Sequence, residues 1–204
     1  MKFKRDFLWL ILFGTLVGLN ETVLGSAHIH NKSVILSVIS LLLLSVARFI
    51  FPAKGTSLFI TGVAVLFKLN DVGVCGCRPE ALIMLGVSFE IFASLMIKGN
   101  TRKTYLFSIV NFITALFVFA AFAVMMRYFI KDEYWFNSKF FTQYIFIKGP
   151  ITAVASAVFC YLGILAVKPL LKRFNNTVVS KTYIVQGTVG VLILACWLFG
   201  YFTV

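Results

Sequence analysis

The chain of 204 residues is 60% hydrophobic and only 13% charged, with a mean hydropathy of +0.97. This composition excludes an ordinary soluble domain and indicates a helical membrane protein with several spans. The net charge of +12 does not indicate nucleic-acid binding, because the basic residues lie between apolar segments and do not form one patch. We therefore expect the lipid bilayer, and no nucleic acid, as a partner.

Seven apolar segments follow one another, each close to the roughly 20 residues that a bilayer core requires. The predicted spans cover residues 7–29, 33–52, 56–73, 79–98, 104–130, 149–168 and 183–203, to within a few residues. The expected fold class is all-α, a polytopic transmembrane helical bundle with short loops in a single membrane domain, 1–204. If one late segment does not cross, six spans remain. Basic residues are richest at alternate segment ends, which predicts a cell-membrane protein with a cytoplasmic N-terminus.

The first segment carries small, acidic and imidazole side chains on one helical face. Gly14, Gly18, Glu21, Gly25 and His28 follow one another at spacings of four and three residues. A carboxylate inside a membrane span costs a few kcal/mol, so Glu21 should face the protein interior and find a partner. The small residues allow a neighbouring helix to approach closely.

The same segment also has features of a signal peptide, because basic residues precede an apolar run and small residues, 25–27, follow it. Asn20 and Glu21 interrupt the run, and the apolar segment is long. We therefore expect it to be retained as the first span.

The third segment offers a partner for the carboxylate of Glu21. Lys68 and Asp71 share a helical face near its end, which the predicted orientation places in the same outer half of the membrane. An ion pair between Glu21 and Lys68 would remove much of the insertion cost of both groups. We hypothesise that this pair, with His28, Asp71 and Glu90, lines a cavity that binds a solute. The alternative is an ion-pair network that only fixes helix packing.

Other polar residues have simpler interpretations. Arg48 ends the second segment, and we expect its side chain to extend to the lipid headgroups. Asn111 and Gln186 are isolated in apolar helices, which predicts interhelical hydrogen bonds. Cys160 and Cys196 lie in apolar runs, as expected of thiols packed in the core.

The segment 131–147 interleaves aromatic and polar residues. This composition predicts an external interfacial helix whose rings anchor the protein at the headgroups. The alternative is a lid over a cavity that faces outward.

His28, His30, Cys75 and Cys77 suggest a chemically different site. Two imidazoles and two thiolates on the same side could hold zinc or another transition metal as cofactor. Cys-x-Cys is not the usual zinc spacing, so loop residues or an oxidised cysteine pair are alternatives. The sequence has no P-loop, nucleophile elbow or dinucleotide motif, and it indicates no catalytic residue.

Gly14 and Gly18 in GTLVG, together with the chain's length and hydropathy, resemble the substrate-binding subunits of energy-coupling-factor importers. The resemblance implies six helices, an outward-facing solute cavity and a first helix that docks the coupling subunit of an ATP-driven module. It also implies that Glu21 and His28 point toward the solute. This chain departs from the family in having seven apolar segments and in lacking the polar N-terminal metal-binding sequence of the nickel and cobalt members.

The function expected is binding of a small solute from the external side, as a carrier or as the binding subunit of an importer. A membrane-embedded metal or thiol redox protein and a non-catalytic assembly partner are the alternatives.

Overall fold

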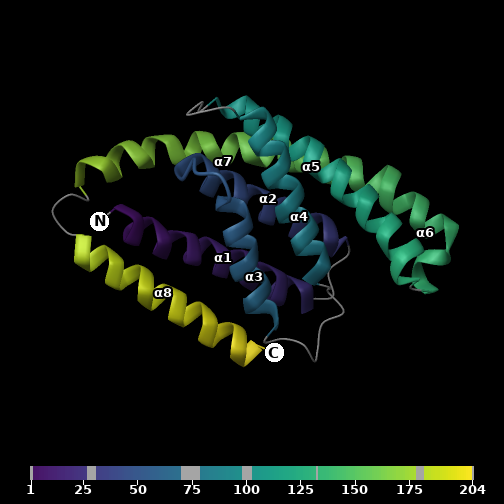
Figure 1. Ribbon diagram of the computed structural model, residues 1–204, viewed down its shortest axis with the longest axis horizontal. Helices are drawn as coiled ribbons and strands as arrows, with labels where there is room; N and C mark the ends of the chain where they lie inside the picture. Colours follow the sequence, from purple (N-terminus) through teal and green to yellow (C-terminus); the bar gives the residue numbers. More distant parts are fainter. Residues whose placement is uncertain are drawn as a thin grey trace.

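The computed structural model describes residues 2–26, 31–69, 79–97, 103–131, 133–177 and 182–203, and these residues are helical apart from short turns (Figure 1). The α-helices are α1 (Lys2–Ser26), α2 (Lys32–Ile50), α3 (Thr56–Leu69), α4 (Pro79–Met96), α5 (Thr104–Val124), α6 (Ser138–Gln143), α7 (Gly149–Thr177) and α8 (Thr182–Thr203). Two π-helical turns, Met125–Ile130 and Tyr144–Lys148, and a 3₁₀ turn, Glu133–Phe136, lie between α5 and α7.

Five helical stretches in the described part of the chain are long and apolar enough to cross a membrane. They are Phe7–Gly25, Lys32–Ile50, Pro79–Met96, Thr104–Ile130 and Ser138–Pro169. Thr56–Lys68 and Gly187–Gly200 are also apolar but shorter. The all-helical membrane class is therefore confirmed. The helix α8 covers the whole of the last predicted span, 183–203, and the third predicted span is described as far as Leu69.

The helix α1 lies at the centre of one half of the molecule, with α8 and α3 beside it and α2 connecting it to α7 (Figure 1). In the other half, α5 packs against α7 and α4, and the α5–α6 end projects beyond the remaining helices (Figure 1). The arrangement brings the end of α1, the beginning of α2 and the segment between α5 and α7 to one region.

The contact between α1 and α3 depends on small residues. A Cβ atom added to Gly14 would lie 2.6 Å from Val63 Cβ, and one added to Gly18 would lie 2.8 Å from Phe67 Cβ. The close helix approach predicted for these glycines is present, but the neighbour is α3 of the same chain. The face expected to dock a coupling subunit is thus already covered, and both glycines are buried.

The segment 131–147 is not a separate interfacial helix. Residues from Ser138 onward continue through the π-helical turn directly into α7, so the aromatic segment forms the first part of a long helix. The sequence prediction ended this segment at residue 147 and began the next span at residue 149. Pro150 favours such a break, because proline lacks an N–H and its ring clashes with the preceding turn of an α-helix. Here the wider π-helical turn comes just before the proline and allows the helix to continue.

Polar side chains connect helices inside the bundle. Asn111 Oδ1 accepts a hydrogen bond from Ser45 Oγ at 2.8 Å, and its Nδ2 donates to the carbonyl oxygen of Ser156 at 3.5 Å. The predicted interhelical role of Asn111 is thus confirmed. Cys160 is fully buried, as expected of a packed thiol. The side chain of Gln186 lies outside the described part.

Candidate functional site

Two buried ion pairs lie at opposite ends of α3. Lys68, in the last turn, is paired with Glu21 of α1. Arg48 of α2 is paired with Glu90 of α4 beside the first turn of α3. The ends of this helix are separated by about 18 Å of helical rise. Glu90, which binds the N-terminus, and Lys68, in the last turn, have the signs that the helix dipole favours at those ends.

The pair predicted between Glu21 and Lys68 is present. Lys68 Nζ lies 3.5 Å from Glu21 Oε2, and the two side chains are 5% and 14% exposed. Lys68 Nζ makes no hydrogen bond to another described residue, so the carboxylate is its main electrostatic partner there. The pairing satisfies the expectation that a carboxylate in a span turns inward.

Glu90 occupies a different environment from the one predicted. Its Oε1 accepts hydrogen bonds from Gly55 N at 2.8 Å and Ser94 Oγ at 3.0 Å, and its Oε2 accepts from Ser57 N at 3.2 Å. Arg48 Nη2 lies 3.4 Å from Oε1. Glu90 therefore caps the beginning of α3, and it is not among the described residues that line the cavity beside Glu21.

Arg48 does not extend to the headgroups as we predicted. Only 4% of its side chain is exposed, because Glu90 offers a buried carboxylate within its reach. A nearby negative charge compensates the guanidinium more directly than a route to solvent would.

A cavity of about 440 Å³ lies beside Glu21. Its wall combines residues from α1, from the beginnings of α2 and α4, from the end of α5 and from the segment that precedes α7. Among the described residues, the charged groups that line it are Glu21, Lys32 and Lys148, whereas Lys68 and Glu90 are not part of its wall. Lys68 therefore supports the carboxylate from outside the cavity.

Aromatic rings form one wall of the cavity. Trp135 is 6% exposed and meets Phe122, Phe140 and Tyr144 in edge-to-face contacts, with ring centroids 5.6, 5.1 and 4.8 Å apart. These are the arrangements that aromatic pairs prefer. Lys148 Nζ lies 5.6 Å from the ring centroid of Phe140 and 5.9 Å from that of Tyr144, within cation–π range.

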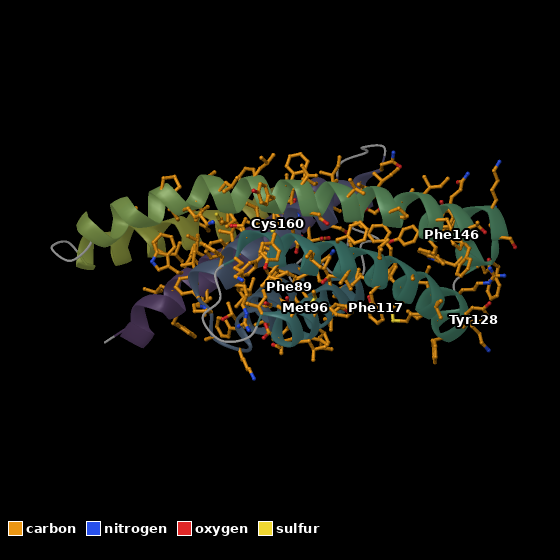
Figure 2. The ribbon with its side chains drawn as sticks, turned by 90° about the horizontal axis from the view of Figure 1, so that it is seen from above. Phe89, Met96, Phe117, Tyr128, Phe146 and Cys160 are labelled. Carbon is orange, nitrogen blue, oxygen red and sulfur yellow. The ribbon has the colours of Figure 1, made fainter. Side chains whose placement is uncertain are left out.

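The placement of these rings favours the lid interpretation of segment 131–147, because several of its aromatic residues face the cavity. Others point outward. Phe146 is 71% exposed. Tyr128, which precedes the segment, is 60% exposed, and both lie at the projecting α5–α6 end (Figure 2). Exposed rings of this kind are typical of the membrane interface. The segment thus has aromatic residues both at the cavity and at the surface, and its role as an anchor or a lid stays a prediction.

The beginning of α2 forms the polar part of the wall. Asn31, Lys32, Ser33 and Ser37 line the cavity. Lys32 Nζ donates a hydrogen bond to the carbonyl oxygen of Gly25 at 3.0 Å, which ties the start of α2 to the end of α1. This contact places the lysine next to the region of Glu21.

Several predicted site residues lie outside the described part of the chain: His28, His30, Asp71, Cys75 and Cys77. Within the described residues, no group of three or more His, Cys, Asp and Glu side chains is placed to hold a metal ion. The metal hypothesis therefore stays a prediction.

Sequence reasoning missed Lys32, Lys148 and Trp135 as members of the candidate site. The two lysines contributed only to the charge asymmetry, and the tryptophan only to an aromatic belt. The signal that could have identified them is the clustering of Lys148 with aromatic residues at helical spacing, Phe140 and Tyr144.

No protein-family model, curated protein or solved structure matches this chain. Function is therefore inferred from the residues around the cavity.

Proposed function

We propose that this chain is a multi-pass membrane protein that binds a small solute in the cavity beside Glu21. The observation that carries the proposal is the coincidence of a membrane-embedded carboxylate, a cavity and a wall of aromatic rings. The cavity volume of about 440 Å³ falls in the range typical of small-molecule sites. With the N-terminus in the cytoplasm, as charge asymmetry predicts, the cavity belongs to the external half.

The two ion pairs provide an internal comparison that supports this function. Glu90 receives three hydrogen bonds and an ion pair, and it does not line the cavity, as expected of a group that fixes helix packing. Glu21 has Lys68 on one side and the cavity on the other. A carboxylate with remaining acceptor capacity beside an open volume is suited to ligand contact.

The chain would act as a carrier or as the binding subunit of an importer. Docking through Gly14 and Gly18 does not support the importer form, because α3 covers both residues. A coupling subunit would need another surface. Uptake by liposomes that contain the purified chain alone would favour the carrier form, and dependence on an added ATPase module would favour the importer form.

Thermal unfolding of the purified protein with a library of small solutes tests the proposal. A solute at a hundred times its Kd stabilises the folded state by about 2.7 kcal/mol, which corresponds to a rise in Tm on the order of 5 °C. Ala81→Trp would fill the cavity and should abolish this rise. Ala195→Trp, on an exposed position of α8, is the matched control and should respond as the unmodified chain does.

Glu21→Gln is the second variant. We expect it to accumulate in membranes but to bind the solute with a changed affinity or to lose its uptake. Normal binding by Glu21→Gln would remove Glu21 from the site. If no solute stabilises the protein, or if Ala81→Trp responds fully, the cavity is not a binding site.

A further inference from the structure

We infer that the ligand of this cavity is an anion with an apolar body, and that Lys32 and Lys148 bind its anionic group. Such a ligand has a carboxylate or phosphate group attached to an aromatic ring or acyl chain. The inference rests on the proposed function and adds the chemical class of the solute.

The balance of charge around the cavity carries the first step. Glu21 contributes one negative charge to the wall, but Lys68 compensates it from outside. Lys32 and Lys148 contribute two positive charges, and neither takes part in the ion pairs Glu21–Lys68 and Arg48–Glu90 of the described residues. The described residues that line the cavity therefore carry an excess of positive charge, which attracts an anion.

The two ammonium groups keep donors for a ligand. An ammonium group has three N–H donors. Lys32 uses one of them on the carbonyl oxygen of Gly25. Lys148 lies over the faces of Phe140 and Tyr144, which support a cation without accepting all of its hydrogen bonds. Each lysine is thus held at the cavity wall and can still donate to an anion.

The beginning of α2 strengthens the same field. Asn31, the residue that precedes α2, lines the cavity, and its side chain makes no capping hydrogen bond. The positive end of this 19-residue helix therefore adds to the attraction that the two lysines exert.

The aromatic wall defines the rest of the ligand. Trp135, Phe140 and Tyr144 favour a planar or acyl body over a fully hydrated ion. The same rings could in principle bind an organic cation. Lys148 already covers two of them, however, and a second cation would be repelled by both ammonium groups.

The anion could come from solution or from the membrane, because an anionic phospholipid offers the same phosphate and acyl chemistry. The experiment measures the Tm of the purified protein under two conditions. In the first, phenyl phosphate is added to the protein in phosphatidylcholine nanodiscs; in the second, the nanodiscs also contain phosphatidylglycerol and no phenyl phosphate is added. Benzyltrimethylammonium and benzyl alcohol are the cationic and neutral counterparts of the soluble probe.

Lys148→Gln removes the charge at the aromatic wall. Removing one charge-assisted hydrogen bond should weaken the binding of phenyl phosphate about ten- to a hundred-fold, and Lys148→Arg should retain most of it. Lys139→Gln is the matched control, because Lys139 is an exposed lysine of the same segment and does not line the cavity. Lys32→Gln tests the second ammonium group and replaces Lys148→Gln if that variant does not fold.

Stabilisation by phenyl phosphate that is lost in Lys148→Gln supports a soluble anion, and the same dependence for phosphatidylglycerol alone supports a lipid headgroup. Stronger stabilisation by benzyltrimethylammonium or benzyl alcohol, blocked by Ala81→Trp, would overturn the anion inference and leave the binding function intact. Stabilisation by phenyl phosphate that neither lysine substitution reduces would also overturn it. No response to any probe or solute would refute both proposals.

Discussion

Replacing Glu90 with alanine should destabilise the fold strongly, because this carboxylate connects three helices. It accepts hydrogen bonds from Gly55 N, Ser57 N and Ser94 Oγ, and it is paired with Arg48 at 3.4 Å. Leaving one partner of a buried ion pair uncompensated costs about 3–5 kcal/mol. Each buried donor left without an acceptor adds about 1–3 kcal/mol, although these costs overlap. We therefore expect a loss of about 4 kcal/mol or more in the free energy of unfolding.

The measurement is the unfolding of purified protein by increasing SDS in mixed micelles, followed by helical circular dichroism. Glu133→Ala is the control, because Glu133 is exposed and its replacement should change the free energy by less than about 0.5 kcal/mol. In a double-mutant cycle, Arg48→Met combined with Glu90→Ala should cost at least about 2 kcal/mol less than the sum of the single changes. A cost below about 1 kcal/mol for Glu90→Ala, or strict additivity in the cycle, would refute the capping and pairing argument.

The other predictions concern the contact between α1 and α3. Glu21→Lys and Lys68→Glu should each reduce the amount of folded protein recovered from membranes, because each places like charges side by side. Combining the two substitutions should restore the amount of folded protein. A double variant as poor as the single ones would contradict a role for the attraction between the two side chains. Gly18→Ala places a Cβ atom 2.8 Å from Phe67 Cβ and should cost about 1–3 kcal/mol, whereas Gly62→Ala meets nothing within 4 Å and should be neutral or slightly stabilising. Thermal unfolding compares the two, and equal effects would show that the α1–α3 contact can relax.

The ion pair between Glu21 and Lys68 could be predicted because its determinants are local. Each residue lies on the small or polar face of its own helix, and counting residues from the helix ends places both in the same half of the bundle. The cost of an unpaired charge in a span then leaves few partners to consider. Periodicity and an insertion cost were sufficient for this contact.

The pair between Arg48 and Glu90 could not be derived in the same way. A long basic side chain near the end of a span can extend to the headgroups or turn inward, and helical periodicity allows both. The direction depends on where α3 begins. Glu90 lies beside its first turn and binds two backbone N–H groups, which fixes a buried carboxylate within reach of the arginine. This arrangement is a property of three helices together.

The lysines at the cavity show a related limit of sequence reasoning. Lys139 lies in the aromatic segment 131–147 and Lys148 follows it directly, and both contribute equally to a count of positive charges. In the folded chain, Lys148 lies over two rings at the cavity wall, whereas Lys139 is exposed. The difference arises because the segment continues into α7 and does not lie along the membrane surface, so that helical spacing turns Lys148, Tyr144 and Phe140 to one side. An error about one helix boundary at Pro150 was therefore enough to hide the positive charge of the cavity.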